Sequence, residues 1–260
     1  MGFFWISDYQ KAIDNSLNTC RIVGDYKMKI IAIIPARGGS KGVSRKNIRL
    51  MAGYPLIHYT IKCALAVSSI NRTIVTTDDE EIAKISRQLG AETPFIRPAE
   101  LACDETPDYP VVRHCLDFLS VEENYHPDAV VFLRPTMPMR TSDEIQGSIQ
   151  ILSDDASLDC VRTARPVPYP PFWMKVIKKD GTLVNFLDTP YNLSRRQDLP
   201  EIMMCDGYVD ISRVSAINKY EAVVGGRIHA LYRETGPIVD IDTQDDWNYC
   251  EYLMRKSNEF

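Results

Sequence analysis

The chain has 260 residues, of which 45% are hydrophobic, which is enough for one large α/β domain with a buried core and a small subdomain. Its formal net charge of −5 and sequence pI near 5.5 lack the basic balance of a nucleic-acid binder. A polyanionic ligand must therefore be met by a local cluster of Lys and Arg or by a metal ion.

The sequence predicts a soluble, cytoplasmic protein with neither a membrane nor a nucleic acid as partner. No run of about eighteen apolar residues reads as a membrane span. Charged residues follow directly after the apolar cluster Phe3–Ile6 and interrupt any signal-peptide core. The seven cysteines are scattered and have no paired spacing typical of structural zinc, so we expect reduced thiols.

In chain order, residues 1–27 form an N-terminal extension without strong periodicity, either carrying an added helix around Tyr9–Leu17 or being a non-native start. The working domain is expected over 28–260. From Ile30 onward, strand-like apolar runs alternate with helical spacing, which predicts a mostly parallel sheet with helices on both faces. We expect strands at 30–34, 72–77, 93–96 and 129–133, and helices at 56–65, 82–89, 109–119 and from Thr141 or Ser142 to Leu152.

After Arg165 the pattern changes, because four prolines crowd into residues 166–171. Asp180-Gly181 then lies between two short apolar runs, which predicts an inserted β-hairpin within 166–200. The polar stretch 188–200 is expected to be a loop. The α/β alternation resumes with strands near 207–212, 228–233 and 237–241 and a last helix from about 244 to 255.

A candidate phosphate-binding loop follows the first strand. It reads PARGGSKG over residues 35–42 and continues with Arg45, Lys46 and Asn47. Glycines let backbone N–H groups approach a phosphate, and Arg37, Lys41 and Lys46 can neutralise a nucleoside triphosphate. The loop matches neither a Walker A motif nor GxGxxG. A basic surface turn is the other reading, but the place after the first strand of an α/β sheet favours ligand binding.

A candidate metal site lies near the C-terminus. Asp240 and Asp242 are two residues apart in the strand-like run IVDIDT, so both carboxylates are expected on one face. Two such carboxylates, completed by phosphate oxygens and water, suit Mg²⁺. The rival reading is that Asp242 or Thr243 caps the next helix together with Asp246. A cap explains one carboxylate but not Asp240, which would be costly if buried unpaired in an apolar strand.

Five segments, in order and in spacing, resemble the N-acylneuraminate cytidylyltransferases, also called CMP-sialic acid synthetases. They read PARGGSKGVSRKNI, TIVTTDDEEIA, IRPAELACDET, FLRPTMPMRT and IVDIDTQDDW, and the similarity extends from about Lys29 to Tyr252. The resemblance implies a Rossmann-like α/β nucleotidyltransferase fold. It also implies a homodimer, in which the small inserted subdomain at 166–200 reaches toward the active site of the other copy.

The same resemblance implies roles for individual residues. Around the triphosphate it places Arg37, Gly38, Gly39, Ser40, Lys41 and Lys46. At the nucleoside end it places Asn47, Arg97 and Asp104. Magnesium would be held by Asp240 and Asp242, and these two carboxylates with Arg37, Lys41 and Lys46 would form the catalytic set.

Two positions depart from the family pattern near the sugar. The chain has Arg134 where the family often has glutamine, and Met204-Cys205-Asp206-Gly207 stands where the family has Arg-Pro-Asn-Gly. An arginine expected to bind the sugar acid is therefore absent, while Arg196, with Arg195 beside it, still matches a basic sugar-contact position. We hypothesise that Arg134 and Arg196 together hold the acceptor's carboxylate, and Asp206 completes the candidate sugar-binding set.

The implied reaction transfers CMP from CTP to the anomeric hydroxyl of an acidic nine-carbon sugar, sialic acid or a relative, and releases pyrophosphate. The hydroxyl would attack the α-phosphorus in line, while the protein positions the reactants and neutralises developing charge. Two alternatives stay open. One is a nucleotidyltransferase for a different sugar or nucleotide, and the other is a nucleotide-binding homologue without turnover.

Overall fold

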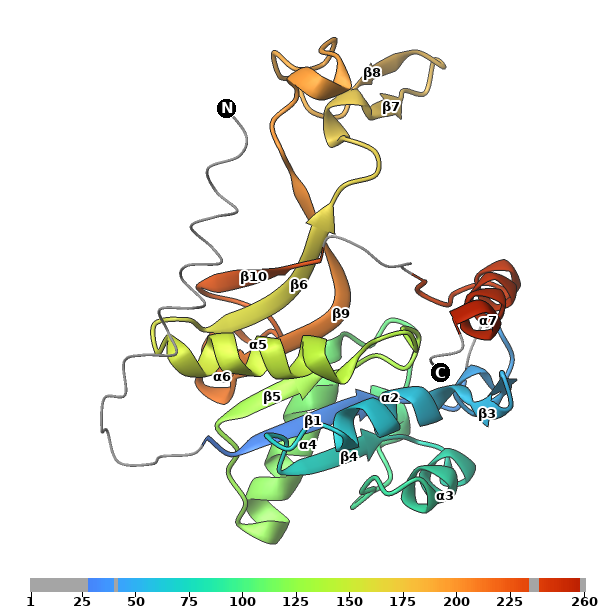
Figure 1. Cartoon of the computed structure of the whole chain (residues 1–260), viewed down its shortest axis with the longest axis vertical. Coiled ribbons are helices and arrows are strands. Elements are labelled where there is room, and N and C mark those ends of the chain that lie inside the picture. The colour runs from blue at the N-terminus through green and yellow to red at the C-terminus, as the bar shows by residue number, and fades with distance from the viewer. Residues whose placement is uncertain (1–27, 40–41, 234–238, 258–260) are drawn as a thin grey trace.

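The computed structural model (Figure 1) describes residues 28–39, 42–233 and 239–257. The predicted extension 1–27, including the helix considered around Tyr9–Leu17, lies outside the described residues. So do Ser40 and Lys41 of the phosphate loop and the first part of the strand predicted at 237–241.

One six-stranded sheet forms the centre of the molecule, with strand order β10-β6-β9-β5-β1-β4. Its strands are β1 (Ile30–Pro35), β4 (Arg72–Thr76), β5 (Ala129–Phe132), β6 (Cys160–Pro166), β9 (Met203–Arg213) and β10 (Ile228–Tyr232). β1 runs parallel to β4 and to β5, and β10 runs parallel to β6. Only β9 is antiparallel to its neighbours β5 and β6, so the predicted, mostly parallel sheet is confirmed.

Helices cover both faces of this sheet, with α2 and α5 on the face toward the viewer in Figure 1 and α4 behind it. The helices are α2 (Leu56–Leu65), α3 (Glu80–Gln88), α4 (Asp108–Glu123), α5 (Ser142–Asp154), α6 (Val214–Tyr220) and α7 (Gln244–Ser257). Short 3₁₀ helices are η1 (Lys46–Ile48), η2 (Ala99–Leu101), η3 (Pro171–Trp173) and η4 (Arg196–Asp198). None of the helices in the described residues is long and apolar enough to cross a membrane.

β1 shows why the sheet is buried on both faces. Ile30, Ala32 and Ile34 pack in a cluster with apolar residues of α2 and α5. Ile31 and Ile33 pack in a second cluster with residues of α4. Successive side chains of a strand point to opposite faces, so an unbroken apolar run is needed where both faces are covered.

A third apolar cluster ties the beginning of the domain to its end. Val43, Met51 and Leu56 pack there with Val239, Ile241 and Trp247. The short ribbon β2 (Leu50–Met51) and β3 (Tyr54–Pro55) supplies part of this cluster between η1 and α2. The cluster holds the C-terminal segment beside the segment that follows the phosphate loop.

The insertion between β6 and β9 carries the predicted hairpin. β7 (Lys175–Ile177) pairs antiparallel with β8 (Leu183–Asn185), and Gly181 in the turn has a positive φ of 83°. Figure 1 shows this excursion standing away from the sheet and its helices. Its apolar side chains are largely exposed, among them Tyr169, Ile177, Leu183, Phe186 and Leu193.

Two predicted strands are wrong over the described residues. At 93–96 only the preceding Glu92 makes an isolated bridge, to Ile74 of β4. Pro94 has no N–H to donate to a strand ladder, which explains why the pairing stops there. Residues 239–241 also belong to no strand, although buried Val239 and Ile241 still flank exposed Asp240.

Candidate active site

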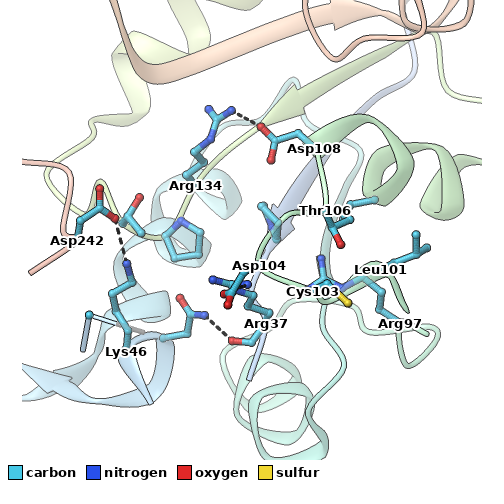
Figure 2. A pocket seen from close by; sticks show the side chains of 16 residues that line it. Arg37, Lys46, Arg97, Leu101, Cys103, Asp104, Thr106, Asp108, Arg134 and Asp242 are labelled. Atoms are coloured by element: carbon cyan, nitrogen blue, oxygen red, sulfur yellow. Dashed lines mark hydrogen bonds and ion pairs between the residues drawn. The ribbon is translucent and has the colours of Figure 1, made fainter. Parts of the chain in front are cut away.

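A cavity of about 400 Å³ opens at the carboxyl ends of β1 and β5 (Figure 2). Pro35 ends β1, and Arg134, Pro135 and Thr136 follow β5. Ligands of open α/β sheets bind at this edge. Its described lining includes the cations Arg37, Lys46, Arg97 and Arg134 and the carboxylates Asp104, Asp108 and Asp242. The cations outnumber the carboxylates, so the cavity suits an anionic ligand.

Two glycines of the phosphate loop, Gly38 and Gly42, have neighbours that leave no room for a side chain. The Gly38 N–H donates to Asp78 Oδ1 at 3.0 Å, and a Cβ on Gly38 would lie 2.7 Å from Asp79 Oδ2. A Cβ on Gly42 would lie 1.8 Å from the carbonyl oxygen of Asp242. Gly39, in contrast, has no atom within 4 Å of its added Cβ. Any larger residue is therefore disfavoured at position 38, where the Asp79 carboxylate lies close, and at position 42, where the Asp242 backbone lies close.

Arg45 joins this loop to the first turn of α3. Its guanidinium pairs with Asp79 and with Glu81 at 2.5 Å. Asp79 also caps α3, accepting from the N–H groups of Glu81 and Ile82 at 3.0 Å. The hydrogen bond from Arg45 holds the pKa of Asp79 below its usual value. Arg45 has φ 52°, so the chain reverses at this residue before η1.

Lys46 and Asn47 line the cavity from η1. Asn47 is buried, and its Nδ2 donates to the carbonyl oxygen of Arg37 at 3.0 Å. The Lys46 ammonium donates to the carbonyl oxygen of Ile241 and lies 3.5 Å from Asp242 Oδ1. Figure 2 shows this lysine and Asp242 facing one another at one side of the cavity.

The two candidate metal-binding carboxylates lie on one side of their segment. Asp240 and Asp242 are exposed, while Val239 and Ile241 are buried in the third cluster. The Ile241 N–H donates to Thr136 at 3.0 Å, which fixes the segment beside the cavity. Both aspartates therefore point to the solvent side, as a strand would place them, although no strand forms.

The helix cap, the rival explanation for these acids, is present and takes the Asp242 N–H, which donates to Asp246 Oδ2 at 3.1 Å, but it does not use the carboxylates of Asp240 or Asp242. Thr243 N and Thr243 Oγ1 both donate to Asp246 Oδ2 at 2.7 Å, and Asp246 N donates back to Thr243 Oγ1 at 3.2 Å. The Thr243 hydroxyl lowers the pKa of Asp246. Because Thr243 and Asp246 complete the cap, the carboxylates of Asp240 and Asp242 are left for another role.

Arg97 is the most buried cation of the cavity, with 4% of its surface exposed. Its Nε has no hydrogen-bond partner among the described residues, and its NH2 group lies 3.7 Å from Asp78 Oδ1. Burial lowers the pKa of Arg97, and the nearby Arg37 adds to this effect. A buried guanidinium with an unused donor favours an anion in the cavity. Arg37 itself pairs with Asp104 at 2.5 Å.

Arg134 lies in a network of four charges. Its guanidinium contacts Asp108 at 2.5 Å and Asp210 at 3.1 Å, and Arg162 reaches the same Asp210 at 2.7 Å. The plane of Arg134 also lies over Phe132, 4.9 Å from the ring centroid. Burial by itself would lower the pKa of Arg134, but the two carboxylates raise it above its usual value. Arg134 is therefore charged and firmly positioned.

The other predicted sugar-binding residues do not meet Arg134 within the chain. Arg195 and Arg196 lie in the excursion at η4, where Arg195 is 74% exposed and pairs with Asp198 at 2.8 Å. Asp206 is buried, pairs with Arg233 at 2.9 Å and accepts from Thr163. None of the three lines the cavity. The hypothesis of a clamp made by Arg134 and Arg196 therefore has no basis in a single copy.

Several contact residues were missed in the sequence. Asp78 follows β4, and its place at the carboxyl end of a parallel strand was a usable signal. Asp108, Asp210 and Arg162 gave no such signal, because their partner Arg134 is remote in sequence and the contacts depend on strand register.

The fold and the cavity define an α/β protein with a cavity suited to an anionic ligand at the carboxyl edge of its sheet. Sequence comparison narrows the class. The Cytidylyltransferase family model matches residues 31–156. A CMP-N,N'-diacetyllegionaminic acid synthase of Legionella pneumophila is 32% identical over 238 residues, covering 89% of this chain and 99% of the relative.

An N-acylneuraminate cytidylyltransferase of Escherichia coli is 29% identical over 89% of this chain, which spans 54% of that longer relative. A solved CMP:2-keto-3-deoxy-manno-octonic acid synthetase, complexed with CTP, superposes with a TM-score of 0.66 at 17% identity, covering 88% of this chain and 99% of that one. The chain belongs to the cytidylyltransferase family. The resemblance found in the sequence motifs is thereby confirmed, and the structural match supports the predicted nucleotidyltransferase fold.

Proposed function

We propose that the protein transfers CMP from CTP to the anomeric hydroxyl of an acidic nine-carbon sugar and releases pyrophosphate. The observation that carries the proposal is the cavity itself, where the phosphate loop, a buried Arg97 and the exposed Asp242 converge at one edge of the sheet. The relatives whose names specify CMP transfer to such sugars, at 32% and 29% identity, support the same reaction.

Three cations that line the cavity have positions suited to parts of CTP. Arg37 and Lys46 flank the loop and would neutralise the triphosphate, with Arg97 behind them. Their present partners, Asp104 and Asp242, are exchanged for phosphate oxygens when the nucleotide binds. Charge developing on the leaving pyrophosphate then meets donors that are already in place.

Asp240 and Asp242 are the residues that would hold Mg²⁺ in this proposal. Their donor set fits, because both are exposed carboxylates on one short segment, Asp242 lines the cavity, and Mg²⁺ takes one or two carboxylates together with substrate phosphates. No group of three or more His, Cys, Asp or Glu suited to a metal occurs among the described residues, so the remaining ligands would be phosphate oxygens and water. Bound Mg²⁺ supplies charge neutralisation at the phosphates.

The excursion supports a homodimer as part of the proposal. Its exposed apolar side chains, with Leu193 97% exposed, form an apolar surface that faces water in a single copy, which is unfavourable. A second copy that covers this surface would also bring its own η4, which carries Arg195 and Arg196, toward a cavity. We place the enzyme in the cytoplasm, where CTP is made and used.

The test is pyrophosphate release from CTP and Mg²⁺ with a panel of acceptors. The panel contains a sialic acid, a legionaminic acid, a pseudaminic acid, an eight-carbon keto-deoxy acid and a neutral sugar, each also offered with UTP. We expect turnover with CTP and at least one nine-carbon acid, and little with UTP or with the neutral sugar. Turnover with UTP, or with the eight-carbon acid alone, would contradict the proposal.

A further inference from the structure

The two carboxylates that hold Arg134 differ in how firmly they are fixed. Asp210 lies on β9 in the middle of the sheet, has 1% of its side chain exposed and is shared with Arg162. Asp108 is the first residue of α4 and has 44% of its side chain exposed. Among the described residues, the one hydrogen-bond partner of its carboxylate is Arg134, so no second side chain fixes it. Asp210 is thus a permanent partner, whereas Asp108 can leave.

The network is electrically balanced before any ligand arrives. The guanidinium groups of Arg134 and Arg162 face the carboxylates of Asp108 and Asp210. A third carboxylate, brought by an acidic sugar, would leave one negative charge without a partner in a half-buried place, which is unfavourable. The balance is restored if one carboxylate moves into water.

Asp108 is the group able to make that move. It occupies the first turn of α4, where the helix N-terminus stabilises a carboxylate even without an arginine partner. Figure 2 shows Asp108 and Arg134 facing one another across one end of the cavity, apart from Arg37 and Asp104. The carboxylate of an acceptor bound at this end would therefore contact Arg134 at the place that the Asp108 carboxylate now occupies.

We propose that Asp108 determines specificity for acidic acceptors by occupying Arg134 until the acceptor's carboxylate replaces it. This inference rests on the proposed function, because it names the group that recognises the acceptor in the same site. A sugar without a carboxylate cannot replace Asp108 and gains nothing from Arg134. The acidic acceptor gains a charge-assisted contact but must first release Asp108, so its affinity is lower than Arg134 alone would give.

The test is the kinetics of Asp108→Asn, in which Arg134 stays but its exchangeable partner loses its charge. We expect the KM for the acidic acceptor to fall about three- to tenfold, since an ion pair of partly exposed groups is worth up to about 1 kcal/mol or slightly more. The KM for CTP should stay the same. The variant Asp117→Asn is the matched control, because Asp117 lies on the same helix, pairs with Arg113 and does not line the cavity.

A second variant and a double variant separate the inference from a structural effect. Asp108→Ser removes the charge while keeping a residue that helix starts accept, so it serves should the asparagine variant fold poorly. In Arg134→Gln the acceptor KM should rise, and adding Asp108→Asn to that variant should change nothing further.

An acceptor KM that rises or stays unchanged in both Asp108 variants, with normal thermal unfolding, overturns the exchange. An equal drop of KM in Arg134→Gln carrying Asp108→Asn also overturns it, because the effect would then not pass through Arg134. Absence of turnover in the unaltered protein with every acidic sugar would instead count against the proposed function, so the two failures are distinguishable.

Discussion

Gly42 and Asp242 are packed backbone against backbone, such that a Cβ on Gly42 would lie 1.8 Å from the Asp242 carbonyl oxygen. Lys46 adds a second link by donating to the carbonyl oxygen of Ile241. The phosphate loop and the pair of carboxylates therefore form one unit, although they come from opposite ends of the domain. A substitution that moves the loop at Gly42 must therefore also move the segment that carries Asp242.

Replacing Gly42 by alanine is expected to lower turnover by about a hundredfold, because shifting catalytic groups by about 1 Å has that order of effect. Pyrophosphate release measures the loss, and a magnesium titration should show weaker metal binding, so that half-maximal activity is reached at a higher magnesium concentration. The matched control is Gly147→Ala in the interior of α5, where the nearest atom to the added Cβ is Leu231 Cδ2 at 4.0 Å.

Gly147→Ala should keep full turnover and should raise the free energy of unfolding by about 0.5–1 kcal/mol, since alanine is the better helix former. Urea denaturation followed by circular dichroism provides the number. Normal turnover in the Gly42 variant would show that the segment around Asp242 can yield without harm, contrary to the close packing described.

Asp240→Asn and Asp242→Asn are expected to reduce turnover strongly at ordinary magnesium concentrations, because each removes one charged oxygen ligand. Raising the magnesium concentration should recover part of the activity. Asp246→Asn is the control, because Asp246 caps α7 and is expected to affect stability more than metal use. Full activity of both metal-site variants would place the metal ligands elsewhere.

The ion pair of Asp79 with Arg45 predicts a pH-dependent contribution to stability. The pKa of Asp79 is lower in the folded protein than its ordinary value, so its contribution is complete above about pH 4 and is lost as the pH falls through the lower, folded pKa. Asp79→Asn should therefore lower the free energy of unfolding by about 1 kcal/mol at neutral pH.

The measurement is urea denaturation of both proteins between pH 7 and the acid limit of folding. The difference between them should shrink on the acid side, where Asp79 is protonated in both the folded and the unfolded state of the unaltered protein. Asp117→Asn is the control, because Asp117 forms a more exposed pair with Arg113. A difference that stays constant down to low pH would mean that the Asp79 charge is unimportant.

The apolar surface of the excursion predicts self-association. Leu193→Lys and Ile177→Lys should give a larger fraction of single copies in sedimentation experiments, because a charge would have to be buried in the contact. Acceptor turnover should fall with dissociation while CTP binding is kept. Val121→Lys, an exposed valine on α4, is the control and should change neither property. An unaltered protein that sediments as a single copy at all concentrations would contradict the homodimer.

The central elements could be predicted because their patterns are complete. β1 has an unbroken apolar run, and α2 shows helical spacing of apolar residues from Leu56 to Leu65. β6 was not predicted, because Arg162 and Arg165, which are both partly buried, interrupt its apolar pattern. The 3.6- and 2-residue periods are read from apolar residues, so they miss a strand in which a position such as Arg162 forms an ion pair with a neighbouring strand.

The local motifs of the site could be predicted, but the ion pairs between residues remote in sequence could not. Neighbouring residues such as Asp240 and Asp242 carry their shared direction in their spacing. The partnership of Arg134 with Asp210 depends on β5 lying beside β9 in one register, where Phe132 faces Asp210. No local pattern contains that register, and the long contacts that create the charge balance around Arg134 were therefore out of reach.

The ends of the excursion have a consequence for how the domain can change. Pro166 at the end of β6 is paired with Met203 at the start of β9, so the chain leaves the sheet and returns to it at neighbouring positions. Relative to the sheet, the whole excursion is one long hairpin loop between β6 and β9, and changing the length of such a loop costs little free energy. We therefore expect that this segment can be shortened to a tight turn while the six-stranded sheet keeps its fold.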